Sequence, residues 1–401
     1  MTNNKIIGPL CARHICAILL LFYAILHKKK IIIDKYEKHY FIFVCIYFIA
    51  SIINLEIFRP YYIPNFISYY FSAFVLILGI PTIISTKNQL YTFICAIFIT
   101  FWLNSTLTLL QFLNFDWAWE LGKMSNAGLI REMETNSWLF ESENTAGFIG
   151  RTITAGFTGF VVTNGYFTTC YFPTALFACE KLRYRRLWVI LTITLCVLTT
   201  FVNQQRSGFF FIILFIIFYL IFLYKEKYKN TLLFAIIVIA IYYLPSFIKT
   251  IDFGRLLNFQ DSTRDSISNN FYAFILTVDS FFGGMHTYTE QYGIMQHNSI
   301  KGAWVVSGIF GFLCFLILYL RLCIRLLKKI FSYVFCSKYS LLEVLLSISS
   351  LLYLVYSLTH ASGLHNDGMM FWLTYTLLLT YERLDTSNNS KINEKNSFIC
   401  R

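Results

Sequence analysis

The stretch GIMQHNSIKGAWVVSGIFG, residues 293–311, places His297 and Asn298 about one helical turn before an apolar run. A neutral imidazole can accept a proton or orient a hydroxyl near pH 7, because its reference pKa is about 6.5. The segment therefore predicts acid–base chemistry on a hydroxyl group, with Asn298 holding the histidine in place. The competing interpretation is a solvated histidine. The same dipeptide recurs at His365 and Asn366, in a short loop where we expect a substitution to be close to neutral.

Three arginines could bind an anion. Arg206 lies in the polar turn FVNQQRSGFF, and Arg255 and Arg264 lie in FGRLLNFQDSTRDSI. Because guanidinium binds phosphate through two parallel hydrogen bonds and stays charged at any relevant pH, these residues predict a clamp for a diphosphate. Two alternatives stay open. Arg206 could extend to lipid phosphates, and Arg264 could pair with its neighbours Asp261 and Asp265.

Residues 116–151 contain six acidic side chains and three tryptophans, Trp117, Trp119 and Trp138. Tryptophan offers an apolar plate for a sugar ring, and carboxylates bind sugar hydroxyls, so the segment could bind a glycan. The alternative is the tryptophan belt of a membrane interface. The sequence has no C-x-x-C pair, zinc-ligand spacing, Walker motif or dinucleotide-binding glycine motif, so we expect neither a metal nor a cofactor.

The elements that must position these residues are membrane helices. Of the 401 residues, 57% are hydrophobic and 13% are charged, against about 25% charged in a soluble domain. The apolar runs cover residues 15–26, 40–55, 60–86, 88–115, 152–179, 187–205, 207–224, 230–248, 302–320, 344–366 and 368–381. Since about 17 to 25 residues cross a bilayer, we expect an all-α, polytopic membrane domain over residues 1–401 with about eleven transmembrane helices.

The distribution of Lys and Arg predicts the orientation of these helices, because the cytoplasmic side retains positive charge. If residues 27–39 lie inside and the spans alternate, 22 of the 33 Lys and Arg fall on that side. Residues 116–151 and 249–301 then form two long outer, periplasmic loops. Topology thus accounts for the basic composition, and we expect no nucleic-acid partner.

The second outer loop contains a predicted amphipathic helix that starts near Asp265 and ends at Gly283-Gly284. Four apolar residues lie at helical spacing along it, namely Ile267, Phe271, Phe274 and Val278. The helix is too short to span a bilayer. It could lie along the membrane interface, or it could be an ordinary connecting helix.

Four motifs together resemble the O-antigen ligase/polymerase superfamily. They are QQRSGFF after a span, STRDS before an amphipathic helix, FFGG, and QHNSIKGAWVVSG leading into a span. In the ligases of this superfamily a His-Asn pair is followed, eleven residues after the histidine, by a glycine, and Gly308 follows His297 at that spacing. The motif-level similarity covers about residues 204–312, and the rest agrees in hydropathy. Lys301 departs from the motif, which has an aliphatic residue there.

The resemblance implies a multi-span glycosyltransferase of the GT-C type in the bacterial inner membrane. It places the diphosphate-binding arginines at Arg206 and Arg264 and the catalytic histidine at His297, with Asn298 and Gly308 as supporting residues. We expect a metal-independent O-antigen polymerase, which joins repeat units on undecaprenyl diphosphate at the periplasmic face. The expected partners are undecaprenyl-diphosphate-linked glycans, membrane lipids and a chain-length regulator protein.

Two other functions stay open. One is the O-antigen ligase that transfers the glycan to lipid A core, and the other, from a different class, is a lipid-linked oligosaccharide flippase. The polar residues gather on one face of the membrane, and the sequence has no matching halves of the kind that repeat-built transporters show. This pattern favours an enzyme at the outer surface over a carrier.

Overall fold

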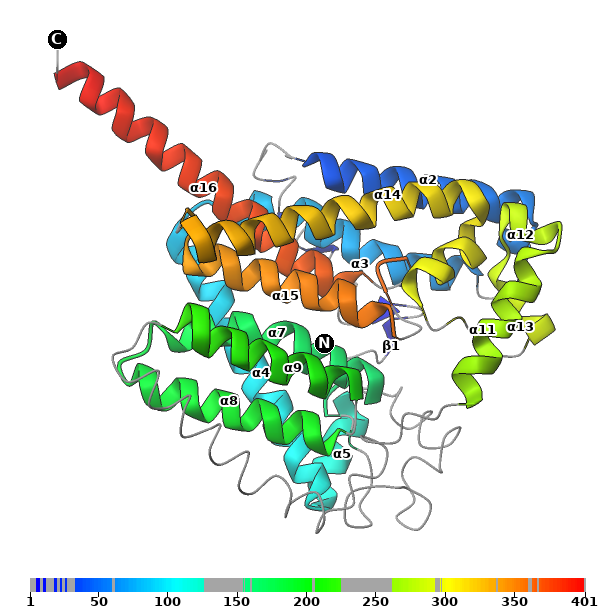
Figure 1. Cartoon of the computed structure of the whole chain (residues 1–401), viewed down its shortest axis with the longest axis horizontal. Coiled ribbons are helices and arrows are strands. Elements are labelled where there is room, and N and C mark those ends of the chain that lie inside the picture. The colour runs from blue at the N-terminus through cyan, green and yellow to red at the C-terminus, as the bar shows by residue number, and fades with distance from the viewer. Residues whose placement is uncertain are drawn as a thin grey trace. The chain divides into compact units, whose positions relative to one another are not determined.

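The structure is a computed structural model and describes most of the chain. The described residues are 5–7, 10–11, 18–19, 22–23, 26, 33–59, 62–125, 154, 156–158, 161–203, 206–224, 262–292, 296, 298–336, 338–359, 363–365 and 368–399. Their regular structure is almost entirely helical (Figure 1). The exception is a short antiparallel ribbon of β1, Lys5–Ile7, and β2, Leu10–Cys11.

The chain divides into two compact units. Unit 1 contains Met1–Ala12, Ile97–Asp261 and Val334–Ser337, and unit 2 contains Arg13–Ala96, Ser262–Tyr333 and Lys338–Arg401. The helices of unit 1 are most of α4 (Lys87–Phe112), α5 (Asp116–Ser125), α7 (Val161–Cys179), α8 (Arg185–Val202), α9 (Arg206–Phe218) and the π-helical turn η4 (Tyr219–Leu223). Those of unit 2 are α2 (Lys35–Ile53), η1 (Glu56–Phe58), α3 (Tyr62–Ile83), the start of α4, α11 (Ser262–Ile275), α12 (Asp279–Phe282), α13 (Met285–Tyr292), most of α14 (Ser299–Cys336), α15 (Leu341–Ser357) and α16 (Met369–Ile399).

Within the described residues, four helices are long and apolar enough to cross a membrane, namely α2, α4, α8 and α14. Shorter apolar helices cover Tyr70–Ile83, Ser207–Leu223 and Leu341–Ser357. These elements support an α-helical membrane protein, as the apolar runs predict. The number of about eleven spans stays a prediction, since the run 230–248 lies outside the described residues and the run 15–26 lies largely outside them.

Two helices are shorter than the apolar runs that predict them. The run 152–179 becomes helical only at Val161, because Gly156 turns the chain at a φ of 59° and its N–H donates to Gln111 Oε1 at 2.9 Å. The run 344–366 is helical only as far as Ser357. Hydropathy predicts burial or contact with lipid, and it does not distinguish a helix from an apolar turn held by buried polar side chains.

Aromatic side chains fill much of the interior of unit 2. Tyr40 of α2 lies 4.7 Å, between ring centroids, from Trp372 of α16, and Phe43 lies 5.0 Å from Phe315 of α14. Tyr40, Phe43, Phe315 and Trp372 are fully buried. Such rings bury a large apolar area each, so they set the spacing of α2, α14 and α16.

Charged side chains hold one end of unit 2, which we call the basic end. Arg325 of α14 contacts Asp34 at 3.2 Å and Glu382 of α16 at 2.8 Å, and it donates to the hydroxyl of Tyr375 at 2.8 Å. Lys329 contacts Glu382 at 2.7 Å. The side chains of these pairs are 9% to 29% exposed, so water and salt screen their charges less than at the surface. The basic end therefore joins the start of α2, the second half of α14 and the end of α16's apolar part.

Two local signals also place helix starts at the basic end. Asp34 caps α2, with Glu37 completing a capping box. Ser340 caps α15 in the same way with Glu343, whose carboxylate lies 3.6 Å from Lys329. Each N-cap satisfies backbone N–H groups that the helix cannot pair itself.

The segments that gather at the basic end are all predicted to lie on the cytoplasmic side. Thr277, which precedes α12, lies at the other end of α14 and is predicted to be periplasmic. We expect a reporter fused after Thr277 to be periplasmic and one fused after Ser332 to be cytoplasmic, because the apolar part of α14 separates them. A phosphatase that folds only in the periplasm and a fluorescent protein that folds only in the cytoplasm measure the two positions. The same compartment for both fusions would rule out α14 as a span.

Candidate functional site

Asn298 is the N-cap of α14. Its Oδ1 accepts hydrogen bonds from the N–H groups of Ile300 at 3.0 Å and Lys301 at 3.1 Å, and its carbonyl accepts from Gly302 at 2.6 Å. Its Nδ2 donates to the carbonyl of Leu358, just beyond α15, at 3.0 Å. Asparagine is among the preferred N-cap residues, so the local sequence already favours a helix start here. Asn298 therefore fixes the first turn of α14. His297, the residue that Asn298 is predicted to support, lies outside the described residues.

A second histidine, His365, is buried against the start of α14. Its Nδ1 lies 3.2 Å from Ser299 Oγ, and its backbone carbonyl accepts from the hydroxyl of Tyr70. A Cβ added at Gly302 would collide with the imidazole, so the glycine makes room for the ring. These contacts argue against the expectation that a change at His365 is close to neutral, because a residue outside the motif in sequence packs against it in space.

The FFGG motif contacts α14 mainly through its backbone, while the ring centroid of Phe281 lies 5.5 Å from that of Phe310. Gly308 interrupts α14 with a φ of 66°, and Gly283 has a φ of 83°. The N–H of Gly284 donates to the carbonyl of Val305 at 2.7 Å, which is a carbonyl that the kink frees from the regular helix pattern. A Cβ at Gly283 would lie 2.5 Å from the backbone nitrogen of Gly308. The two glycine motifs that the sequence singles out therefore meet, and we call this part of unit 2 the glycine end.

The amphipathic helix of the second outer loop is present as α11, and its apolar face packs on protein. Phe271 and Phe274 form a buried cluster with Tyr288 of α13 and Val305 of α14. Ile267 is buried as well, whereas Val278 is 84% exposed because α11 ends at Ile275. The inclusion of Val278 in the apolar face was wrong. The packing favours a connecting helix over a helix that lies on lipid.

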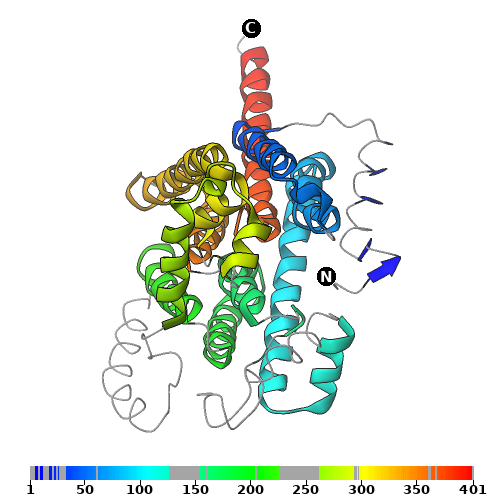
Figure 2. The ribbon, with the colours of Figure 1, turned by 90° about the vertical axis from the view of Figure 1, so that its right-hand side faces the viewer.

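Lys301, which departs from the family motif, links α11 to α14. Its Nζ donates to Ser268 Oγ at 3.0 Å and lies 5.1 Å and 4.9 Å from the ring centroids of Phe271 and Tyr272. Trp304 links α14 to α12, since its Nε1 donates to the carbonyl of Ser280 at 3.0 Å. Figures 1 and 2 show α11 to α13, in yellow-green, beside the start of α14.

Side chains after α2, which the sequence did not single out, also hold the glycine end. Asn54 Nδ2 donates to the carbonyl of Gly283 at 2.6 Å, and Glu56 Oε1 accepts from the N–H of His286 at 2.7 Å. Burial raises the pKa of the Glu56 carboxyl, while the hydrogen bond from His286 opposes that shift. A carboxylate directly after an apolar run was the only signal in the sequence that could have indicated Glu56.

The arginines are placed only by their backbone. Arg264 lies in the first turn of α11 and Arg206 is the first residue of α9, and the side chains of both lie outside the described part of the structure, as does the whole of Arg255. Arg264 thus belongs to α11, the helix that packs on the first turns of α14. Arg206 belongs to unit 1, so the clamp that would join it to Arg264 stays a prediction.

The tryptophans of the first outer loop differ from one another. Trp117 of α5 is 55% exposed and is free to contact a ligand. Trp119 is half-buried, and its Nε1 donates to the carbonyl of Gln111 at 3.2 Å, which is a structural role. Trp138 lies outside the described residues. In the described part of the chain, no three His, Cys, Asp or Glu side chains lie together in a way that could hold a metal ion.

The site thus consists of a helix start with an N-cap, a glycine-lined backbone contact and a helix that carries an arginine, all in a chain with helices able to span a membrane. Comparison of the chain with family models, with curated proteins and with solved structures gives no match. The superfamily therefore remains an interpretation of the motifs.

The kink at Gly308 is testable. We expect Gly308→Ala to lower the melting temperature of the detergent-purified protein, because an L-residue in the left-handed conformation costs about 1 to 2 kcal/mol and the new Cβ would lie 2.5 Å from the carbonyl carbon of Phe282. Leu313→Ala, at an exposed position of the same helix, is the matched control and should change the melting temperature less. Equal effects would show that the backbone contact is not what holds this end.

The burial of His365 gives a second test. We expect His365→Ala to destabilise the purified protein by about 1 to 3 kcal/mol, since the substitution leaves the buried hydroxyl of Ser299 without this partner. His286→Ala is the control, because that side chain is half-exposed and its pair with Glu290 is worth at most about 1 kcal/mol. A melting temperature unchanged by His365→Ala would contradict the packing described above.

Proposed function

We propose that this chain is a GT-C-type glycosyltransferase of the O-antigen ligase/polymerase superfamily, with about eleven spans in the bacterial inner membrane. It acts as the polymerase that joins undecaprenyl-diphosphate-linked repeat units at the periplasmic face. The observation that carries the proposal is the assembly at the glycine end. The helix α11, whose first turn carries STRDS, packs there together with two further motifs, FFGG and the segment from Asn298 to Gly308, although up to 46 residues separate them.

In the proposed reaction, the hydroxyl of an acceptor sugar attacks the anomeric carbon of a lipid-linked donor. The new C–O bond forms as the bond from the anomeric carbon to the diphosphate oxygen breaks, and the electron pair leaves with the lipid diphosphate. His297 takes the hydroxyl proton. Arg264, with Arg206 and Arg255, stabilises the charge that grows on the diphosphate, and this preorganised positive charge makes a metal ion unnecessary.

Neighbouring residues have positioning roles in this scheme. Asn298 caps α14 and thereby fixes the backbone directly after His297. Lys301 holds α11, and with it the backbone of Arg264, against the same helix, and the ring of Trp304 packs on Phe271 of α11. The exposed ring of Trp117 is the remaining candidate for contact with a sugar.

We expect His297→Ala to slow chain extension by about 10²- to 10⁴-fold, the usual contribution of a general base, while the protein remains inserted and abundant. His286→Ala, a second histidine of the same outer segment, is the control and should extend chains at close to the normal rate. The assay is polymer length in membranes supplied with lipid-linked repeat units, with and without EDTA, and activity should survive the chelator. Near-normal extension by His297→Ala would remove the proposed base.

The arginine role is tested in the same assay. A hydrogen bond to a charged group is worth about 1.5 to 3 kcal/mol, so Arg264→Ala should slow transfer at least about tenfold. Arg206→Lys should also be impaired, because an ammonium cannot form two parallel bonds to a phosphate. Full polymer from both variants would leave the arginines as lipid anchors.

The ligase and the flippase are separated from the polymerase by the lipopolysaccharide of a deletion strain. Loss of a polymerase leaves single repeat units on lipid A core. Loss of a ligase leaves lipid-linked polymer and uncapped core, and loss of a flippase leaves lipid-linked single units on the cytoplasmic face.

A further inference from the structure

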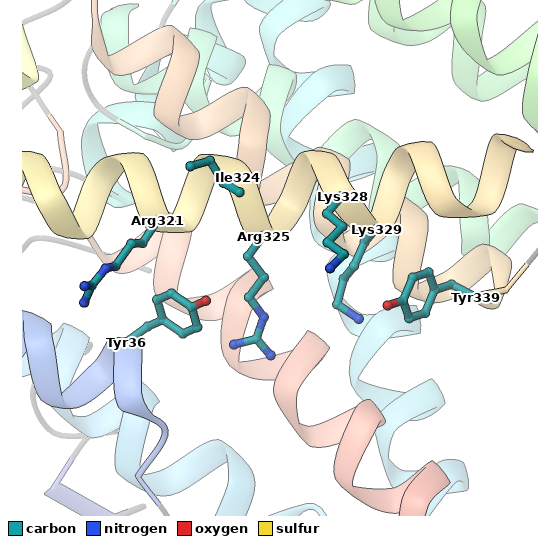
Figure 3. Close-up of a pocket in the computed structure, with 7 residues that line it drawn as sticks. All are labelled: Tyr36, Arg321, Ile324, Arg325, Lys328, Lys329 and Tyr339. Atoms are coloured by element: carbon teal, nitrogen blue, oxygen red, sulfur yellow. The ribbon is translucent and has the colours of Figure 1, made fainter. Parts of the chain in front are cut away.

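The basic end of unit 2 contains a cavity of about 410 Å³ that the proposed reaction does not use. Its lining residues are Tyr36, Arg321, Ile324, Arg325, Lys328, Lys329 and Tyr339. Figure 3 shows the four cations reaching from one side of α14, with Tyr36 beside the arginines and Tyr339 beside Lys329. No carboxylate is among the lining residues. A cavity of this size and charge fits a small anion or the headgroup of a lipid.

Two of the four cations are structural. Arg325 and Lys329 make the ion pairs with Asp34, Glu343 and Glu382 that hold the basic end. Tyrosine rings also contact them, since Arg325 lies 4.9 Å from the ring centroid of Tyr36 and Lys329 lies 4.1 Å from that of Tyr339. The carboxylates that balance these two cations are not among the residues that line the cavity.

The other two cations, Arg321 and Lys328, are exposed and have no ion-pair partner among the described residues. They lie seven positions apart, which is two turns of the same helix face. Their charges are therefore available to a ligand, with the tyrosine hydroxyls as hydrogen-bond donors.

An exposed apolar stripe runs along α14 next to these cations. It consists of Leu320, Ile324, Leu327 and Phe331, at helical spacing. A free phosphate ion would gain nothing from this stripe, whereas the acyl chains of a lipid would bury it. Basic pockets between membrane helices on the cytoplasmic side bind lipid headgroups, and the distribution of Lys and Arg predicts that side for this end.

We propose that the cavity binds the phosphate headgroup of an anionic phospholipid, between Arg321 and Lys328, with its acyl chains along the apolar stripe. The site is independent of the proposed glycosyl transfer, because it involves neither His297 nor the glycine end. A lipid bound there would join α2, α14 and the segment before α15 at the membrane surface.

The test uses the full-length protein in nanodiscs made of phosphatidylcholine alone or of an equal mixture with phosphatidylglycerol. After extraction into detergent, mass spectrometry measures the phosphatidylglycerol that stays bound. We expect the unchanged protein from the mixture to retain phosphatidylglycerol. The double variant Arg321→Gln, Lys328→Gln should retain at most about one tenth of that amount. The variant should fold, since neither side chain makes an ion pair in the described part of the chain.

The matched control is Lys181→Gln with Arg183→Gln, which removes two charges from another loop that is predicted to lie inside. This control should retain phosphatidylglycerol like the unchanged protein. Equal loss in both double variants, or no preference of the unchanged protein for phosphatidylglycerol, would overturn the proposal.

Two further measurements separate the sources of the phosphate and guard against misfolding. If inorganic phosphate displaces the bound phosphatidylglycerol at millimolar concentration, the cavity is a free-anion site and the assignment to a lipid is wrong. If the double variant does not fold, Arg321→Lys with Lys328→Arg keeps the charges and should retain the lipid. Loss of the lipid from that folded, charge-conserving pair would also overturn the proposal.

Discussion

The glycine end depends on a contact between two backbones. Gly283 reaches the kink at Gly308 so closely that a single Cβ on either glycine would collide, and the N–H of Gly284 donates to the carbonyl of Val305. An unpaired backbone group in an apolar setting is costly, so the kink and the FFGG turn need each other. Helices α11 and α13 pack on α14 beside this contact. Asn54 and Glu56 form hydrogen bonds with Gly283 and His286 on either side of Gly284.

Helix α14 connects two ends that are built by different forces. At its start the links are hydrogen bonds of a cap and of backbone, which are short-range and directional. Near its other end they are ion pairs of Arg325 and Lys329 with carboxylates from three other segments. Arg321 and Lys328 lie 13 and 20 residues beyond the kink at Gly308, which corresponds to roughly 20 and 30 Å of helix. The lipid site proposed there is therefore separated from the glycine end by up to about the thickness of a hydrocarbon core.

The two His-Asn pairs illustrate how environment assigns different roles to identical dipeptides. His365 is buried, contacts Ser299 and fits over Gly302, so its ring fills space beside α14. In the other pair, Asn298 caps α14 with its side chain. The dipeptide alone therefore could not indicate that His365 packs in the interior.

The sequence by itself determined the helical class, the apolar segments able to cross a membrane, and the helical region that begins near Asp265 and ends before Gly283. These features depend on composition, on spacing along one helix, or on the local needs of a turn, and neighbouring residues carry that information. The sequence also singled out Asn298 and Gly308, but it predicted neither the cap nor the kink that they form.

Only the tertiary structure decided that α11 packs on protein, that Lys301 joins α11 to α14, and that Glu56 and His365 support the same end. It also decided that two of the four cations that line the cavity are bound by carboxylates while Arg321 and Lys328 remain available. The partners are distant in sequence, for example 33 positions for Lys301 and Ser268 and 291 positions for Arg325 and Asp34. Hydrophobic pattern and local spacing cannot encode such pairings, because the free energy of a buried contact depends on which distant side chain arrives there.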